Sequence, residues 1–239
     1  MIKAIFFDLD GTLCNPGSSW EMGISASFTL FESRFPGRRS ELETSWRETN
    51  TILLGELAAG RMPMREVISD RFPRTLSAIG IQDRTFGDEL NDCLSATRKD
   101  ALRPMVGAHD TLRTLRTGYY LGVITNGSDA NYADSQMATI EQIRVQDLVD
   151  SIWISDAVGH RKPDARIFLA ALAGADVNAN ESIYVGDSVP HDVAGANAAG
   201  MSSILIDPSG TFDQSDGDIR PNHVIRSLSD VIPILKEIE

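Results

Sequence analysis

The sequence lacks the features that typify secreted, disulfide-stabilised and membrane-spanning proteins. Only two of its 239 residues are cysteines, Cys14 and Cys93, which are too few for a disulfide framework and indicate reduced thiols. No apolar run approaches the ~18 residues that a membrane span needs. The N-terminus lacks a basic segment followed by a long apolar run, so we expect no signal peptide and a cytoplasmic protein.

The sequence also has few basic residues relative to its acidic ones. It contains 22 Lys and Arg against 34 Asp and Glu, a formal net charge of -12, which argues against nucleic acid and anionic membranes as partners. Small anions are not excluded, because a bound cation can reverse the local field. The hydrophobic share of 42% is ordinary for a globular protein, and the length suits one large domain or a domain with an insertion.

Short apolar runs alternate with helical patterns in much of the chain. This alternation predicts an α/β fold, a Rossmann-like parallel sheet with helices on both faces. We expect helices that include residues 129–145, 189–199 and one with Pro163 at its first position. The predicted strands lie at residues 2–7, 119–125, 151–155, 182–185, 203–206 and, more weakly, 223–225.

The stretch after the first strand has no strand pattern and repeated helical periodicity. We expect helices at residues 20–35, 40–59, 63–79 and 83–101, the second of them with Ser40 as N-cap and Glu43 completing a capping box. Pro73 should kink the third helix, and Gly87 weakens the prediction of the fourth. These patterns predict a core domain of residues 1–14 and 104–239 and an inserted all-helical cap domain of residues 15–103.

Polar side chains follow the predicted strands, where a parallel sheet places its ligand site. Any one of them could be an ordinary solvated turn or loop residue, but their common location favours a functional site. They are Asp8 and Asp10 after the first strand, Thr125 and Asn126 after the second, Lys162 before the helix that follows the third, and Asp187 and Asp192 after the fourth.

These residue types suit phosphoryl transfer. Several carboxylates that converge on one point need a cation to offset their repulsion, and a site with few oxygen ligands and open positions suits Mg²⁺. A lysine, a hydroxyl and turn N–H groups beside the cation can hold a phosphoryl group. One carboxylate can attack phosphorus, and a second can protonate the leaving oxygen and later deprotonate water.

Four motifs, taken together and in order, resemble the haloacid dehalogenase superfamily, in particular its phosphatases with a helical cap inserted after the first motif. The resemblance covers nearly the whole chain. The motifs are Asp8-Leu9-Asp10-Gly11-Thr12-Leu13, Ile124-Thr125-Asn126-Gly127, Lys162-Pro163-Asp164, and Gly186-Asp187-Ser188 with Asp192.

The resemblance implies a role for each motif residue. Asp8 would be the nucleophile and a metal ligand, and Asp10 the general acid/base, with its backbone carbonyl also on the metal. Asp187 would bind Mg²⁺ directly, and Asp192 would support it through water or hydrogen bonds. The implied phosphate-binding residues are Gly11, Thr12, Thr125, Asn126 through the backbone around it, and Lys162, the last also neutralising charge as a catalytic residue.

The resemblance leaves alternatives open. Dehalogenases of this superfamily lack the aspartate at the position of Asp10, so that activity is disfavoured. Phosphomutases of the β-phosphoglucomutase type share all four motifs but usually carry valine where Thr12 stands, which favours hydrolysis. A catalytically silent binding protein would be expected to have lost Asp8, Asp10 or Lys162. The expected partner is a small-molecule phosphate ester, such as a nucleotide, a sugar phosphate or a phosphoglycolate-like compound; the sequence indicates no oligomeric state.

Overall fold

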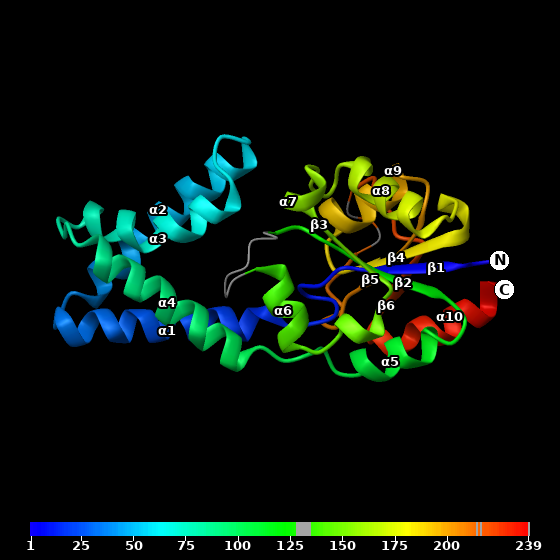
Figure 1. Ribbon diagram of the computed structural model, residues 1–239, viewed down its shortest axis with the longest axis horizontal. Coiled ribbons are helices and arrows are strands. Elements are labelled where there is room, and N and C mark those ends of the chain that lie inside the picture. The colour runs from blue at the N-terminus through cyan, green and yellow to red at the C-terminus, as the bar shows by residue number, and fades with distance from the viewer. Residues whose placement is uncertain (128–134, 214, 216, 239) are drawn as a thin grey trace. The chain divides into compact units, whose positions relative to one another are not determined.

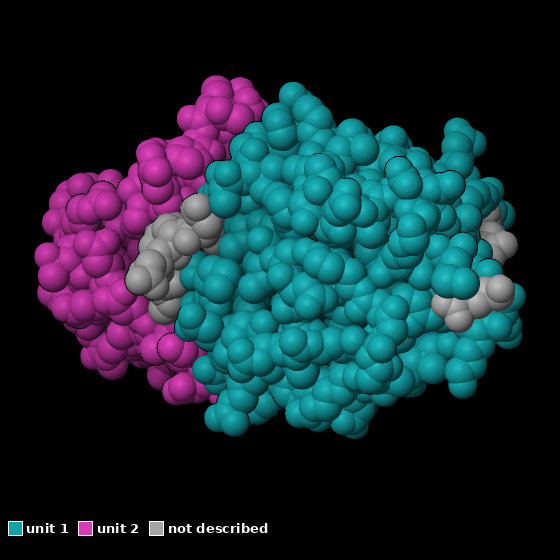
Figure 2. All heavy atoms as spheres, turned by 45° about the vertical axis from the view of Figure 1, so that its right-hand side comes forward, with its two compact units in different colours: residues 1–15, 103–131, 135–239 teal, residues 16–102, 132–134 magenta. Residues whose placement is uncertain are grey.

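The computed structural model of this chain describes residues 1–127, 135–213, 215 and 217–238. These residues form two compact units, which Figure 2 colours separately. The first unit contains residues 1–15 and the described residues from 103 onward, and the second contains residues 16–102. None of the described helices combines the length and the apolar character that a membrane crossing requires.

The first unit is built on a six-stranded parallel sheet in the order β3-β2-β1-β4-β5-β6. The chain runs from the central strand β1 outward to β2 and β3, then crosses to β4 on the other side of β1. Strand order therefore reverses beside β1, which is where such sheets bind ligands. The strands are β1 Ala4–Phe7, β2 Tyr120–Thr125, β3 Ser151–Ile154, β4 Ser182–Gly186, β5 Ser202–Ile206 and β6 His223–Ile225.

Helices cover both faces of this sheet, which confirms the predicted α/β class. In Figure 1, α8 (Ala165–Ala175) and α9 (Ala194–Ala198) lie on one face, and α5 (Ala108–Leu115) and α10 (Val231–Ile238) lie on the other. All four residues of β1 are buried, as a strand with two covered faces requires. Successive side chains of the strand point to opposite faces of the sheet, and Phe6 packs in one cluster with Phe168 of α8 and Tyr184 of β4.

Three predicted helices of this unit differ from the structure. Helix α8 begins at Ala165 with Asp164 as its N-cap, so the prediction of a helix with Pro163 at its first position was wrong. The pattern over 189–199 divides into a π-helical turn, Val189–Val193, and the short α9. The pattern over 129–145 yields α6 at Gln136–Gln142, while residues 129–134 lie outside the described residues.

Shorter helices complete the first unit. A four-residue helix, α7, follows β3 directly, and single 3₁₀ turns precede β3, β4 and α10. Their bounds are α7 Ser155–Val158, η1 Gln146–Leu148, η2 Ala179–Glu181 and η4 Leu228–Asp230.

The second unit consists of helices whose aromatic and leucine side chains form its core, including Phe31, Leu42 and Phe72. Gly87 of α4 packs directly on Pro73 of α3: a Cβ at Gly87 would lie 2.8 Å from the proline ring. Helix α3 continues through Pro73, and the glycine permits the close approach of the two helices. The helices are α1 Pro16–Arg34, α2 Arg39–Ala58, α3 Met64–Ala78 and α4 Arg84–Ala101.

The predicted capping box at the start of α2 is wrong. The helix begins at Arg39, one residue before the proposed cap, and its N-cap residue Arg38 makes no side-chain capping hydrogen bond. Glu43 instead accepts a hydrogen bond from Arg39 at 2.8 Å, and Arg38 binds Glu41 through two nitrogens at 2.6 and 2.8 Å. The carboxylate of Glu43, which the capping box required, is thus engaged in an ion pair with Arg39.

Candidate active site

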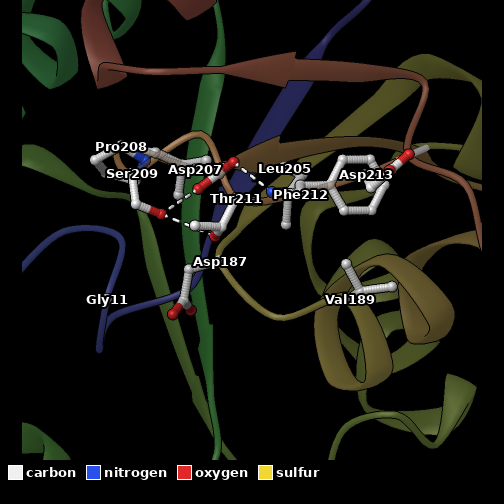
Figure 3. A pocket seen from close by; sticks show the side chains of 11 residues that line it. Gly11, Asp187, Val189, Leu205, Asp207, Pro208, Ser209, Thr211, Phe212 and Asp213 are labelled. Atoms are coloured by element: carbon white, nitrogen blue, oxygen red, sulfur yellow. Dashed lines mark hydrogen bonds between the residues drawn. The ribbon is translucent and has the colours of Figure 1, made fainter. Parts of the chain in front are cut away.

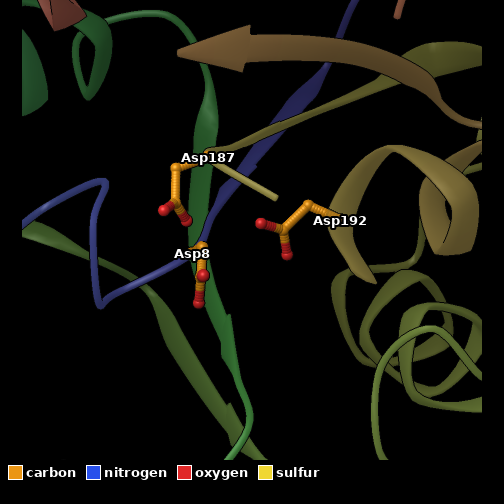
Figure 4. A group of neighbouring side chains, drawn as sticks. All are labelled: Asp8, Asp187 and Asp192. Carbon is orange, nitrogen blue, oxygen red and sulfur yellow. The ribbon is translucent and has the colours of Figure 1, made fainter. Parts of the chain in front are cut away.

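Three carboxylates converge at the reversal point of the sheet. Asp8 follows β1, Asp187 follows β4, and Asp192 lies in the π-helical turn after β4. One oxygen from each lies within 4.8 Å of the others, and Figure 4 shows the three side chains gathered at the ends of the strands. Asp8 directly follows β1, and its backbone N–H continues the pairing with β4 by bonding the carbonyl of Val185 at 2.8 Å.

Two glycines make room for these carboxylates. Gly11 has φ +82°, and a Cβ there would lie 2.2 Å from Asp187 Oδ2. At Gly186 a Cβ would lie 2.4 Å from the carboxyl carbon of Asp192. Any larger residue at either position would displace a carboxylate, so both glycines are part of the site's construction.

Lys162 lies between two of the carboxylates and is 5% exposed. Its Nζ is 2.7 Å from Asp8 Oδ1 and 2.7 Å from Asp192 Oδ1, and it donates to the Tyr184 hydroxyl at 2.9 Å. All three ammonium hydrogens therefore have partners. Burial alone would lower the pKa of Lys162, but the charges of Asp8 and Asp192 raise it, so the lysine stays a cation.

One lysine does not offset the negative charge of the cluster. Burial, with the charge of Asp192, raises the pKa of Asp8 to about 7 against the pull of Lys162. Desolvation and the charge of Asp192 raise the pKa of Asp187 to about 6. The protein alone thus disfavours the ionised forms of both groups, and a further positive charge would stabilise them.

The oxygen atoms differ in their freedom to bind a cation. Asp192 uses Oδ1 for Lys162 and Tyr184 and Oδ2 for the backbone N–H of Ser188, at 2.9 Å. Asp8 uses Oδ1 for Lys162 and for the N–H of Leu9, and no hydrogen bond to its Oδ2 is present among the described residues. Carboxylate oxygens at this spacing fit the hard-ligand preference of Mg²⁺, with Asp8 and Asp187 the better placed to bind it.

The loops after β2 and before α8 are joined through Asn126. Its Oδ1 accepts from the backbone N–H of Lys162 at 2.8 Å, and its Nδ2 donates to the Lys162 carbonyl at 3.0 Å. The next residue, Gly127, donates to Ser155 Oγ at 3.0 Å. The Asn126 side chain therefore positions Lys162, in addition to the predicted role of its backbone at the phosphate.

Asp10 does not belong to the group of three carboxylates. Its Oδ2 accepts from Gln136 Nε2 at 2.9 Å, and its Oδ1 lies 3.6 Å from Cys14 Sγ. The Thr125 side chain at the end of β2 is buried and also contacts Gln136. The Thr12 hydroxyl is fully buried and has no hydrogen-bond partner in the described part of the chain.

A hollow of about 510 Å³ lies beside Asp187, between the turn at Gly11 and the segment that follows β5 (Figure 3). Its wall carries further acid groups. The N–H of Phe212 and the hydroxyl of Ser209 bond the Asp207 carboxylate and lower its pKa to about 2. The lining residues are Gly11, Asp187, Val189, Leu205, Ile206, Asp207, Pro208, Ser209, Thr211, Phe212 and Asp213.

Two residues of the site were not anticipated from the sequence. Tyr184 is a large polar residue in the middle of the buried strand β4, and this signal could have identified it; its hydroxyl contacts Lys162 and donates to the Ile124 carbonyl at 2.9 Å. The sequence around Gln136 gives no such signal, because no neighbouring residue indicates that this polar side chain is buried. The structure brings together Asp8, Lys162, Asp187 and Asp192 and links Asp10 with Thr125, while their chemical roles stay predictions.

Comparisons with known proteins agree with this geometry. Residues 5–206 match the model of the haloacid dehalogenase-like hydrolases. The chain is 28% identical to a glyceraldehyde 3-phosphate phosphatase of Methanothermobacter thermautotrophicus, with 100% of both chains covered. It is 25% identical to a pyrimidine 5'-nucleotidase of Escherichia coli, over 97% of this chain and 96% of that protein.

Solved structures give the same assignment. The crystal structure of a 2-haloacid dehalogenase from Pseudomonas syringae superposes with a TM-score of 0.77 at 26% identity, over 100% of both chains. The family match covers the first and fourth motifs, which build the carboxylate cluster, and the loops that contain Asn126 and Lys162. The chain therefore belongs to the haloacid dehalogenase-like hydrolases.

Proposed function

We propose that this protein is a Mg²⁺-dependent phosphatase that hydrolyses a small phosphomonoester through an aspartyl-phosphate on Asp8. The observation that carries the proposal is the state of Asp8: a buried carboxylate that Lys162 holds through one oxygen at 2.7 Å, with its other oxygen unbonded among the described residues. A carboxylate oriented in this way can attack a phosphorus atom bound beside the lysine.

Asp8 and Asp187 would hold the Mg²⁺ ion, and Asp192 would orient it indirectly through Lys162 and Ser188. The ion would withdraw charge from the phosphoryl oxygens and offset the repulsion between the carboxylates. The resemblance to the family adds the backbone carbonyl of Asp10 as a further ligand.

The first chemical step forms one bond and breaks another. Asp8 attacks phosphorus, the bond from phosphorus to the ester oxygen breaks, and Asp10 gives its proton to that oxygen. Lys162 and the Thr125 hydroxyl stabilise the charge on the phosphoryl oxygens. In the second step Asp10 takes a proton from water, the water oxygen attacks phosphorus, and Asp8 leaves as a carboxylate.

The presence of Asp10 favours phosphate esters over haloacids, although several similar solved structures are named dehalogenases. An alkoxide leaving group needs a proton, and Asp10 lies beside the Thr125 loop where it can supply one. The relatives named for glyceraldehyde 3-phosphate and pyrimidine nucleotides support a small soluble ester as substrate. We further propose that residues 15–103 act as a cap domain that excludes bulky esters.

A phosphate-release screen tests the proposal. Purified protein is incubated with small phosphate esters, with Mg²⁺ or with excess EDTA, and inorganic phosphate is measured. We expect activity on at least one ester that EDTA abolishes and that Asp8→Asn removes, whereas Asp88→Asn, an exposed aspartate of the second unit, retains it. Full activity in chelated buffer, or turnover by Asp8→Asn, would refute the proposed mechanism.

A further inference from the structure

Gln136 is a buried amide side chain that touches both Asp10 and the loop after β2. Its Nε2 lies 2.9 Å from Asp10 Oδ2, 2.6 Å from Thr125 Oγ1 and 3.1 Å from the backbone oxygen of Asn126. The side chain is 7% exposed. One nitrogen thus connects the proposed proton donor of the first motif with the proposed phosphate-binding hydroxyl of the second.

The amide can take only one orientation at this position. The backbone carbonyl of Asn126 can only accept a hydrogen bond, so the nitrogen of Gln136 must face it. The reversed amide would place its oxygen against this carbonyl and against the carboxyl group of Asp10. The Gln136 nitrogen shares its two hydrogens among these three acceptors. Because an amide nitrogen cannot accept a hydrogen bond, Thr125 Oγ1 is the acceptor in their contact, and the hydroxyl hydrogen of Thr125 stays available for a phosphoryl oxygen.

The surrounding residues fix this position. Ser135 caps α6 by accepting from the N–H of Ala138 at 3.1 Å, so Gln136 is the first residue of the helix. Long side chains at the start of a helix point back toward its N-terminus, here toward the loop after β2. A Cβ at Gly127 would lie 2.4 Å from Gln136 Cγ, so the absence of a side chain at Gly127 provides the space that Gln136 occupies.

We infer that Gln136 is a positioning residue, which holds the carboxyl group of Asp10 in line with the leaving oxygen of a phosphoryl group bound at Thr125. The inference rests on the proposed phosphatase function. An amide does not titrate, so Gln136 acts through Asp10 rather than as a proton donor. The other bond to Asp10, from Cys14 Sγ at 3.6 Å, comes from a weak S–H donor, so Gln136 supplies the stronger restraint.

The test removes the donor but keeps the shape. Gln136→Met is compared with Gln142→Met, a partly exposed glutamine at the other end of the same helix. The substrates are glycerol 2-phosphate, whose alkoxide needs a proton, and p-nitrophenyl phosphate, whose phenolate does not. We expect Gln136→Met to lower kcat by about 10-fold or more on the alkyl ester and by less than about 3-fold on the aryl ester, within the scale of a positioned acid. Gln142→Met should leave both values unchanged.

A second measurement separates positioning from a purely structural role. Added to Asp10→Asn, the Gln136→Met substitution should lower kcat on the alkyl ester by less than about 2-fold, because the group it positions no longer works. If Gln136→Met unfolds at a lower temperature than the wild-type protein, Gln136→Glu replaces it in the test, because glutamate keeps the size of the side chain but presents a hydrogen-bond acceptor to Asp10. It should show the same preference for the aryl ester.

Two results would overturn the inference while wild-type protein remains active. They are an equal loss of kcat on both esters in the folded variants, and losses that multiply in the double variant. If the wild-type protein hydrolyses neither these esters nor any other in the presence of Mg²⁺, the proposed function itself fails, and this inference fails with it.

Discussion

Replacing Gly11 by alanine should disable the metal site by displacing Asp187. Gly11 has φ +82°, which costs an alanine roughly 1–2 kcal/mol. The new Cβ would lie 2.2 Å from Asp187 Oδ2, whereas ordinary contacts begin at 3.4 Å, so the carboxylate must move by about 1.2 Å. Metal ligands tolerate deviations of only about 0.2 Å, and a misplacement of about 1 Å costs roughly 10²-fold in rate.

A control variant, Gly107→Ala, measures the free-energy cost of placing alanine at a positive φ without displacing a carboxylate. Gly107 has φ +81° in the same unit, and apart from its two chain neighbours no atom of the described residues lies within 4 Å of a Cβ placed there. Gly107→Ala and Gly11→Ala should therefore both lower the free energy of unfolding by roughly 1–2 kcal/mol. Only Gly11→Ala should raise the Mg²⁺ concentration needed for half-maximal activity and lower kcat by about 100-fold.

The assay is phosphate release during a Mg²⁺ titration, with urea unfolding of each variant in parallel. If both alanine variants required the same Mg²⁺ concentration as the wild-type protein, Asp187 would not be a metal ligand placed by the Gly11 turn. A loss of activity in both variants would show instead that general destabilisation, and not displacement of the carboxylate, accounts for the effect.

Further predictions concern the aspartates. Asp187→Asn should raise the Mg²⁺ requirement more than Asp192→Asn, and the reverse order in a titration would exchange their assigned roles. Asp10→Asn should slow alkyl ester hydrolysis by about 10²-fold or more and aryl ester hydrolysis by less; equal losses would exclude acid catalysis. Because the pKa values of Asp8 (about 7) and Asp187 (about 6) lie above the ordinary 3.8, the folded metal-free protein binds more protons than the unfolded chain, and its stability should fall as pH rises from about 4 to about 7. Mg²⁺ should therefore raise Tm more at about pH 8 than at about pH 5, and an equal increase would contradict this.

The sheet was predictable because its strands are short apolar runs that end in polar residues. All six lie within two residues of their predicted bounds, and the reversal beside β1 places the polar strand ends together. The start of α2 was mispredicted because local ion pairs, such as Arg39 with Glu43, displaced the expected cap.

The supporting residues of the site could not be predicted in this way. Gln136 is 126 residues from Asp10 along the chain, and only the folded sheet brings the two side chains within 2.9 Å. Asn126 was assigned to the phosphate through its backbone, whereas its side chain pairs with the backbone of Lys162, which is 36 residues away. Strand-end position identifies the groups that face a ligand, but it contains no information on the neighbours that hold them.

The most direct test of the central claim is to trap the phosphorylated carboxylate. The protein is mixed with its best ester and Mg²⁺, quenched during turnover and reduced with borohydride, which converts an aspartyl-phosphate to homoserine. Mass spectrometry of the peptide that contains residues 4–13 should then show homoserine at position 8 and unmodified Asp10. Turnover that leaves Asp8 unmodified, or a phosphorylated residue elsewhere in the chain, would contradict the proposed mechanism.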